Sequence, residues 1–276
     1  MRRVVFNQKG GVGKSSITVN LAAISASRGK RTLVIDLDSQ SNSSQYLLGD
    51  KATHHQHKPI LEPNIETFFD EVLNASQSKG LIGSALGSIL KNKERGLDAV
   101  IHSTPFANLF VIPSSPNLGG IEHALQSKHK IFKLRDALNA LDSQYDEIYI
   151  DTPPAFNFFS LSALIAADRV LIPFDCDVFS RRALLTLLEN VVEAKGDHNP
   201  HLDVEGIVVN QFQSQAKLPR EVVQELKDEG LPVFNTMLPS SVIMKESHQK
   251  NKPLIHLNPD HKLSVAYVNL FDELSS

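Results

Sequence analysis

A glycine-rich segment near the start of the chain restricts the fold more than any other feature. Residues 9–16 read Lys-Gly-Gly-Val-Gly-Lys-Ser-Ser, between an apolar run at residues 4–6 and an apolar helical pattern over residues 17–24. A glycine-rich turn between a strand and a helix gathers backbone N–H groups around phosphate oxygens, and the helix dipole favours the anion. Lys14 can reach the β- and γ-phosphates, and the Ser15 hydroxyl suits Mg²⁺. The segment therefore predicts a nucleotide-binding site.

Length and composition describe an ordinary globular protein. The chain has 276 residues, 41% hydrophobic and 21% charged, which favours a single α/β domain over residues 1–276. No apolar run approaches the roughly 18 residues that a membrane-spanning helix needs. The lone cysteine, Cys176, excludes an internal disulfide and fits a reducing cytoplasm. The net charge of −3 gives no general attraction to nucleic acid, so any DNA contact requires a local basic patch.

Strand-like and helix-like patterns alternate along the chain. Residues 32–36 form a short apolar run that ends in an acid, as expected for a buried parallel strand. Further strands are predicted at residues 109–112, 147–150, 169–172 and 204–209. Two of the helices between them are predicted from apolar faces made of Ile131, Leu134, Leu138 and Leu141, and of Leu184, Leu188, Val191 and Val192. This order predicts an α/β fold: a mainly parallel twisted sheet with helices on both faces.

Residues 50–96 interrupt the alternation. A polar loop at residues 51–59 precedes a predicted helix at residues 65–73 and a weaker one around residues 81–90. His54, His55 and His57 raise the alternative of a metal site, but no carboxylate or cysteine cluster accompanies them, so a surface loop is favoured. We interpret the segment as an elaboration of the domain that serves partner specificity.

The lysine that begins the glycine-rich segment indicates a particular class of phosphate loop. With Lys9 five residues before Lys14, the segment resembles the deviant Walker A motif of the ParA/MinD ATPases, a group of the SIMIBI class of P-loop NTPases. The resemblance implies that Lys9 reaches across a homodimer to the phosphates bound by the other subunit, as an arginine finger does. The alternative is a solvated loop lysine. The nucleotide contacts implied by the motif are Lys9, Gly10, Gly11, Val12, Gly13, Lys14, Ser15 and Ser16.

Two later acidic segments occur in the order of that family. Asp36-Leu-Asp38-Ser39-Gln40 resembles its Asp-x-Asp-Pro-Gln segment, with Ser39 in place of the usual proline. The resemblance implies that Asp38 positions the attacking water and that Asp36 supports the magnesium region together with Ser15. Asp151 ends an apolar strand before two prolines, like a Walker B aspartate, and a carboxylate oxygen suits Mg²⁺. The alternative for the first pair is two acids that merely follow a strand end.

The resemblance also suggests an adenine pocket. Asn210 ends the last predicted strand and offers an amide that can match the adenine edge. Pro239 lies where family members pack a proline-containing loop against the base. Both residues also fit ordinary turns. The chain lacks the guanine signature Asn/Thr-Lys-x-Asp, so ATP is favoured over GTP as the cofactor, together with Mg²⁺.

The residues that would contact DNA are the least defined. ParA relatives often carry Arg-Asn after the proline, whereas Ser240 and Ser241 follow Pro239 here. The remaining candidates are Lys217, Arg220, Lys245, Lys250 and Lys252, with Arg181 and Arg182 as a more distant option. A scattered, solvated set of cations is the alternative.

The resemblance implies a cytoplasmic ATPase whose ATP-bound homodimer binds DNA non-specifically and associates with the nucleoid. A ParB-like protein or a cargo adaptor would stimulate hydrolysis, and DNA or other cargo would be segregated or positioned. One alternative is a MinD-like membrane-cycling ATPase, but the last residues, 265–276, contain no lysine or arginine, so no membrane partner is expected. Another alternative is a metabolic ATP-dependent enzyme on the same fold.

Overall fold

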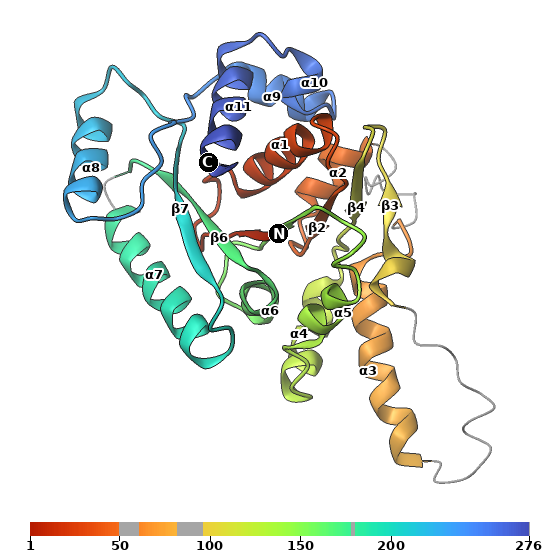
Figure 1. Ribbon diagram of the computed structural model, residues 1–276. Helices are drawn as coiled ribbons and strands as arrows, with labels where there is room; N and C mark the ends of the chain where they lie inside the picture. Colours follow the sequence, from red (N-terminus) through yellow and green to blue (C-terminus); the bar gives the residue numbers. More distant parts are fainter. Residues whose placement is uncertain (50–60, 82–95, 178–179, 276) are drawn as a thin grey trace.

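The computed structural model has a central β-sheet with helices packed on both of its faces (Figure 1). It describes residues 1–49, 61–81, 96–177 and 180–275. Within these ranges the strand order is β3-β4-β2-β5-β1-β6-β7, and each pairing is parallel except that of β3 with β4.

The strands are β1 (Arg2–Val5), β2 (Thr32–Asp36), β3 (His102–Ser103), β4 (Leu109–Ile112), β5 (Glu147–Asp151), β6 (Arg169–Asp175) and β7 (Asp203–Asn210). The helices of the first half are α1 (Lys14–Ser27), α2 (Asn42–Leu48), α3 (Ile65–Leu81), the 3-10 turn η2 (Leu97–Val100), α4 (Leu118–Ser127) and α5 (Lys133–Asn139). Those of the second half are α6 (Phe158–Ala166), α7 (Ser180–Asp197), α8 (Lys217–Asp228), α9 (Val242–Gln249), α10 (Leu254–Leu257) and α11 (Lys262–Ser275).

Two apolar cores lie on opposite faces of the sheet. Val4 packs in the core covered by α3 to α8, whereas its neighbour Val5 packs in the core beneath α1, α2, α9, α10 and α11. Successive side chains of a strand point to opposite faces, so a strand buried on both sides is apolar throughout. This arrangement confirms the predicted α/β fold and explains why its strands appear in the sequence as unbroken apolar runs.

Most predicted elements are present, with differences at their ends. The helix predicted at residues 65–73 continues to Leu81 as α3, and β3 was not predicted because two residues carry no pattern. The expected burial of Val192 on α7 is wrong, since this side chain is 66% exposed. Leu184 and Val191 face the core as predicted and Leu188 packs against it, while Leu187 takes the place of Val192, because helical spacing puts position 187 rather than 192 on that side.

Part of the predicted elaboration lies outside the described residues. This applies to the polar loop at residues 51–59 with its three histidines, and to residues 82–90 of the predicted weak helix. Among the residues that are described, there is no group of three or more His, Cys, Asp or Glu side chains that could hold a metal ion. In the same ranges, every helix is too short or too polar to span a bilayer.

The carboxyl ends of the strands bring polar side chains to one edge of the sheet. Asp36 of β2 pairs in register with Asp151 of β5, and Asp175 of β6 with Asn210 of β7. The glycine-rich segment leaves β1 between β5 and β6 at this edge. Ligands of open α/β sheets bind outside the carboxyl ends of the strands. The fold therefore assembles segments far apart in the sequence around one candidate site.

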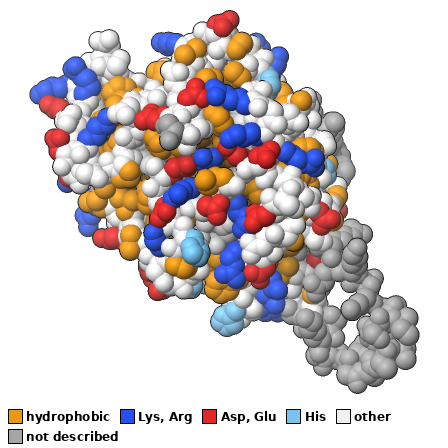
Figure 2. All heavy atoms as spheres, viewed as in Figure 1, with side chains coloured by type: hydrophobic (Ala, Val, Ile, Leu, Met, Phe, Trp, Pro, Cys, Tyr) orange, Lys and Arg blue, Asp and Glu red, His pale blue; other side chains and the backbone are white. Residues whose placement is uncertain are grey.

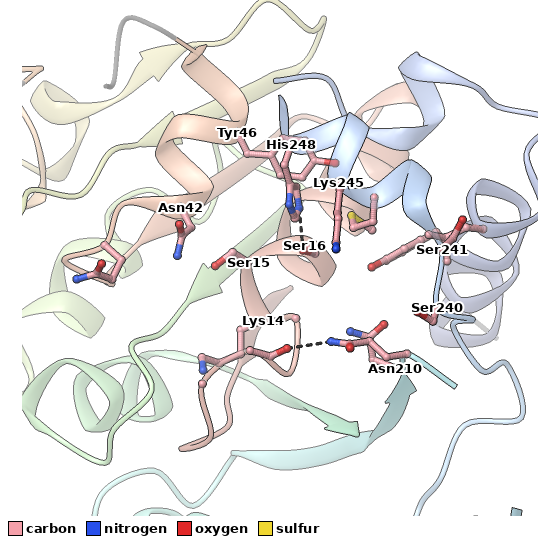
Figure 3. Close-up of a pocket in the computed structure, with 18 of the residues that line it drawn as sticks. Lys14, Ser15, Ser16, Asn42, Tyr46, Asn210, Ser240, Ser241, Lys245 and His248 are labelled. Carbon is pink, nitrogen blue, oxygen red and sulfur yellow. Dashed lines mark hydrogen bonds between the residues drawn. The ribbon is translucent and has the colours of Figure 1, made fainter. Parts of the chain in front are cut away.

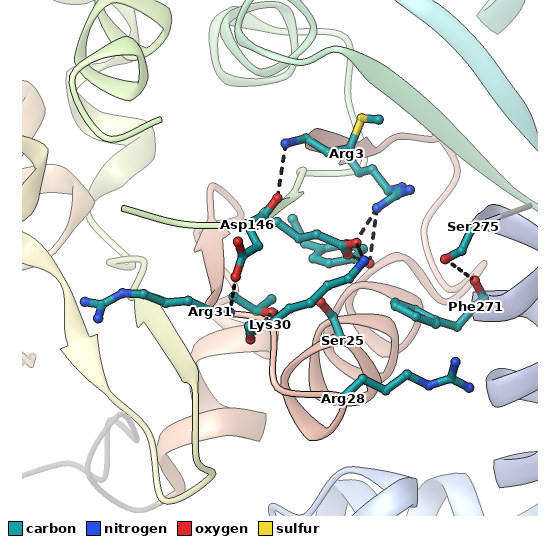
Figure 4. A network of polar contacts seen from close by, with 12 residues as sticks. Arg3, Ser25, Arg28, Lys30, Arg31, Asp146, Phe271 and Ser275 are labelled. Carbon is teal, nitrogen blue, oxygen red and sulfur yellow. Dashed lines mark hydrogen bonds and ion pairs between the residues drawn. The ribbon is translucent and has the colours of Figure 1, made fainter. Parts of the chain in front are cut away.

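An ion-pair network holds the strands together near their amino ends (Figure 4). Arg3 Nε donates to both carboxylate oxygens of Glu205, at 3.0 and 2.9 Å, and Arg3 Nη1 lies 3.1 Å from Glu147 Oε2. The side chains of Arg3 and Glu147 are each 5% exposed, and Lys30 also pairs with Glu147. The network joins β1, β5 and β7 away from the candidate site, so it can be tested for stability alone.

Arg3→Ala should lower the free energy of unfolding by about 3–5 kcal/mol, because it leaves the mostly buried Glu205 carboxylate without its ion-pair partner and Glu147 with Lys30 alone. Urea denaturation followed by circular dichroism measures the change. Arg135→Ala is the control, since the Arg135–Asp136 pair is 39% and 50% exposed, and it should cost no more than about 1 kcal/mol. Equal losses for the two variants would contradict the structural role of the network.

Candidate active site

The glycine-rich loop has the backbone that a phosphate cradle requires. Gly11 and Gly13 have φ values of 78° and 94°, in the left-handed region that favours glycine. A Cβ atom on Gly13 would lie 2.2 Å from Asn210 Nδ2, so this position also needs the missing side chain. The loop runs directly into the N-terminus of α1, whose first backbone N–H groups have no acceptor within the helix. These donors suit phosphate oxygens.

The end of β7 holds this loop from the side. Asn210 Nδ2 donates to the Val12 carbonyl at 2.8 Å, and Gln211 Nε2 donates to the Gly11 carbonyl at 2.9 Å. The Phe212 N–H donates to the Leu238 carbonyl at 2.9 Å, which brings the following Pro239 beside the loop. Asn210 thus uses an N–H of its side-chain amide to position the loop, while its amide oxygen can accept a hydrogen bond from a ligand.

A cavity of about 630 Å³ opens over the loop (Figure 3). The predicted site residues that line it are Gly10, Gly11, Gly13, Lys14, Ser15, Ser16, Asp38, Asn210 and Pro239, along with Lys245 from the DNA candidates. Val12, Asp36 and Asp151 are fully buried around it. Sequence reasoning missed other lining residues, including Asn42, Tyr46, Gln211, Met244, His248 and Tyr267. No motif in the sequence marks them, because they come from α2, α9, α11 and the residue that follows β7.

Lys14 is positioned inside the loop. Its side chain is buried, and Lys14 Nζ donates to the Lys9 carbonyl at 3.0 Å. Burial lowers the pKa of Lys14 from its ordinary value, and the nearby carboxylates of Asp151 and Asp38 oppose this shift. A bound polyphosphate would add negative charge and stabilise the ammonium further. Lys14 is therefore placed to bind phosphate as a cation.

Lys9 is bound by carboxylates of its own chain. Lys9 Nζ lies 2.7 Å from Asp175 Oδ2 and 3.2 Å from Asp177 Oδ2, and its side chain is 35% exposed. Although partial burial opposes it, hydrogen bonds from Lys9 to Asp175 and Asp177 raise the pKa of Lys9 above its ordinary value. Asp175 lies at the carboxyl end of β6, so Lys9 turns toward this strand in the single chain.

Asp151 has the properties of a magnesium-site carboxylate. Its side chain is fully buried, Asp151 Oδ2 accepts a hydrogen bond from Ser43 Oγ at 2.7 Å, and Oδ1 has no partner among the described residues. Burial raises the pKa of Asp151, while hydrogen bonds from Ser15 and Ser43 lower it. An unpartnered carboxylate oxygen close to a hydroxyl is the kind of donor set that Mg²⁺ binds, directly or through water. The residues present fit the ion.

Asp36 differs from Asp151 because both of its oxygens have partners. Oδ1 accepts from the Asp38 N–H at 3.1 Å, and Oδ2 accepts from the Ser44 N–H at 2.8 Å and from Ser44 Oγ at 2.7 Å. Burial and the nearby charge of Asp151 raise the pKa of Asp36. This geometry holds the segment that carries Asp38 and leaves Asp36 without an oxygen free of protein hydrogen bonds.

Asp38 faces the cavity from that segment. Its side chain is 6% exposed, and Oδ1 accepts a hydrogen bond from the Gln40 N–H at 3.0 Å. Burial raises the pKa of Asp38, and the hydrogen bond from Gln40 and the charge of Lys14 oppose this. Ser39 in place of proline does not prevent the turn, because the Asp36 carboxylate accepts from the Asp38 N–H and the Asp38 carboxylate accepts from the Gln40 N–H.

The predicted DNA-binding lysines and arginine fall into two groups (Figure 1). Lys217 and Arg220 are on α8, where Lys217 pairs with Glu221 at 3.1 Å, while Lys245, Lys250 and Lys252 are on or just after α9. Figure 2 shows Lys and Arg interspersed with Asp and Glu over the face in view. The structure thus brings the α9 group close to the cavity and leaves the α8 group apart from it.

Comparisons with known proteins show what the chain as a whole is similar to. A family model described as an AAA domain matches residues 3–204. The chromosome partitioning protein ParA of Myxococcus xanthus (strain DK1622) is 34% identical over 273 residues, covering 98% of this chain and 86% of the relative.

Two solved structures share the fold. McdA of Cyanothece in complex with ATP has a TM-score of 0.78 at 21% identity, covering 99% of this chain and 96% of that one. Cobyrinic acid a,c-diamide synthase from Mycobacterium smegmatis, with bound ATP analog and magnesium, has a TM-score of 0.76 at 25% identity, covering 98% and 92%. The similarity to ParA extends over nearly the whole chain. In addition, the phosphate loop, Asp38 and Asp151 lie around one cavity. The chain therefore belongs to the ParA/MinD family of deviant Walker A ATPases.

Proposed function

We propose that the chain is an ATP-dependent dimerising switch that binds DNA non-specifically and segregates or positions DNA or other cargo. ATP and Mg²⁺ are its cofactors, and hydrolysis of ATP to ADP and phosphate is its reaction. The observation that carries the proposal is the additional lysine at the start of the loop. Lys9 lies beside the phosphate site without lining its cavity. A cation in this place would act on a neighbouring subunit by leaving Asp175 and Asp177 of its own chain.

The residues of the cavity divide the work of hydrolysis. Lys14 and the backbone N–H groups of the loop hold the β- and γ-phosphates, and Asp38 accepts a hydrogen bond from the attacking water and orients it. When bound near Ser15 and Asp151, Mg²⁺ neutralises charge on the phosphate oxygens. Phosphoryl transfer depends mainly on positioning and on stabilising this charge, so the geometry suits a slow hydrolase that a further cation accelerates.

Dimerisation supplies that cation. Closing two subunits face to face would move Lys9 from Asp175 and Asp177 to the γ-phosphate held by the partner. The carboxylates that hold Lys9 in the single chain compete with this move, so the monomer is favoured until ATP is bound in both subunits. Asn210 and Pro239 would place the adenine at the side of the loop opposite the γ-phosphate.

The closed dimer would bind DNA through the cations around α9. Lys250 and Lys252 are exposed and lie two residues apart, just after the end of that helix. Each would occur twice in a dimer. Lys217 and Arg220 on α8 are a second candidate group. Binding of this kind places the ATP state on the nucleoid, in the cytoplasm.

The chain acts as one domain in this proposal. Residues 50–96 elaborate the domain and serve the recognition of a ParB-like or cargo-adaptor protein, which stimulates hydrolysis and releases the dimer. Cobyrinic acid a,c-diamide synthase shows that this fold also occurs in a metabolic enzyme. ATP hydrolysis that rises with a small metabolite, and not with DNA and a protein partner, would favour that alternative.

The packing of α11, the last helix, argues against a membrane-cycling function. This helix buries Leu263, Tyr267, Leu270 and Phe271 in the core beneath α1. An amphipathic membrane helix instead needs its apolar face available to the lipid. In liposome flotation with ATP we expect the protein to remain unbound.

A salt titration of binding to unrelated DNA sequences tests the proposal. With ATP, the protein should bind all sequences alike, with a Kd of about 10⁻⁴–10⁻⁶ M at physiological salt and a linear fall of log affinity with log salt. Lys250→Ala and Lys252→Ala each remove a contact from both subunits, so each should reduce the slope by about 1.8. Lys128→Ala, an exposed lysine at the end of α4, is the charge-matched control. Absence of ATP-dependent binding even at low salt would exclude the DNA-binding function.

A further inference from the structure

Helix α9 forms a wall of the nucleotide cavity and presents two basic side chains to it. Lys245 and His248 both line the cavity, and Figure 3 shows them directed from α9 toward the start of α1. They are three residues apart, so they share one face of the helix. None of the roles given above to the phosphate loop or the acids involves His248.

His248 is hydrogen-bonded at the edge of the phosphate site. Its Nε2 lies 3.0 Å from Ser16 Oγ, in the first turn of α1. The backbone N–H groups of that turn are the donors available to a bound phosphate. A phosphate oxygen seated there therefore comes within reach of the Ser16 hydroxyl and of the imidazole that contacts it.

A buried polar cluster lies beside the ring of His248, which is itself an exposed residue. The ring packs edge-on against Tyr46, with centroids 4.8 Å apart and planes at 85°. The Tyr46 hydroxyl accepts from Asn20 Nδ2 at 3.3 Å and bonds to Ser247 Oγ, and Asn20 Nδ2 also donates to the Ser16 carbonyl at 2.8 Å. The cluster joins α1, α2 and α9, so the backbone that carries His248 is tied to the first turn of α1.

Two further polar side chains, Tyr267 of α11 and Lys245 of α9, line the cavity near His248. Tyr267, which is 1% exposed, lines the cavity, and its hydroxyl has no hydrogen-bond partner among the described residues. Lys245 is exposed, which leaves its ammonium able to turn toward a ligand. Lys245 can therefore add a contact to a nucleotide beyond those of the phosphate loop.

We propose that His248 and Lys245 form a phosphate-binding arm on α9 for an adenosine di- or triphosphate. On nucleotide binding, His248 exchanges the Ser16 hydroxyl for a phosphate oxygen at the first turn of α1, and Lys245 adds positive charge from the same face. The inference rests on the ATP site of the proposed function. It assigns Lys245 to the nucleotide and leaves Lys250 and Lys252 for DNA.

Calorimetric titration of the full chain with Mg·ADP tests the arm, because ADP avoids ATP-dependent dimerisation. His248→Ala should weaken ADP binding about tenfold, the effect of losing a hydrogen bond to a charged group. His248→Gln keeps an N–H donor and should recover most of the affinity. Lys245→Ala should weaken binding about threefold at low salt and less at high salt, because its charge is exposed.

Gln249→Ala is the matched control, since its neighbouring exposed side chain on α9 is not among those that line the cavity. It should bind ADP like the wild type. A His248→Ala protein that melts at a lower temperature but binds ADP with unchanged affinity would overturn the inference and show a structural role only. Failure of the wild type itself to bind ADP would instead contradict the ATP site of the proposed function.

Discussion

Lys14→Ala should remove measurable ATP binding and lower the rate of ATP hydrolysis by about 10²–10³-fold, as expected when a preorganised cation is taken from a phosphoryl-transfer site. Lys14 is the buried cation of the loop and donates to the Lys9 carbonyl inside it. Its removal leaves the phosphates facing Asp38 and Asp151 without a compensating protein charge. Calorimetry with Mg·ATP and a phosphate-release assay measure the two effects.

The control for this variant is Lys128→Ala, which changes the charge equally on the surface at the end of α4. It should leave both measurements unchanged. Circular dichroism should show that Lys14→Ala remains folded, because no apolar contact of either core is lost. ATP binding at wild-type affinity by folded Lys14→Ala would mean that the cavity over the loop is not the ATP site.

Lys9→Ala should lower ATP hydrolysis by about 10³-fold or more, the effect of losing a cation supplied in trans, while the monomer still binds nucleotide. The Lys9 side chain does not line the cavity of its own chain and is paired with Asp175 and Asp177. Its loss therefore affects dimer closure and charge stabilisation more than binding. Size-exclusion chromatography with ATP and titration with Mg·ADP separate the two steps.

Asp175→Asn is the counterpart of Lys9→Ala. It weakens one of the two ion pairs that hold Lys9 within the chain, so less ATP should be needed for dimerisation. The two substitutions thus shift the dimer in opposite directions if Lys9 acts in trans. A Lys9→Ala protein that dimerises with ATP as readily as the wild type would exclude the trans role.

The parts of the site that could be predicted from the sequence are continuous segments. Residues 9–16, Asp38 and Asp151 each follow a buried apolar strand, and the carboxyl ends of parallel strands meet at one edge, so their proximity follows from the fold class. The strands themselves were recognisable because burial on both faces makes them apolar throughout. Val192 was misassigned because an exposed valine on a helix is indistinguishable by type from a buried one.

The remaining parts depend on contacts between distant segments. His248 touches Ser16 across 232 positions of sequence, and Asn210 touches Val12 across 198. Neither contact has a local pattern, because it results from the packing of α9 against α1 and of β7 beside the loop. The carboxylates that pair with Lys9 within the chain, Asp175 and Asp177, are likewise distant in sequence, at the end of β6 and just after it.

By itself, the sequence determined the α/β class, the phosphate loop and the acids that follow β2 and β5, because local backbone chemistry and apolar periodicity specify them. Only the tertiary structure decided that both carboxylate oxygens of Asp36 accept hydrogen bonds, from Ser44 and Asp38. It likewise decided that Asp151 Oδ1 has no hydrogen-bond partner among the described residues. It also decided that Lys245 borders the nucleotide cavity. The physical reason is that hydrogen-bond partners and burial belong to the packed chain, and a residue's type states only what it can donate, accept or bury.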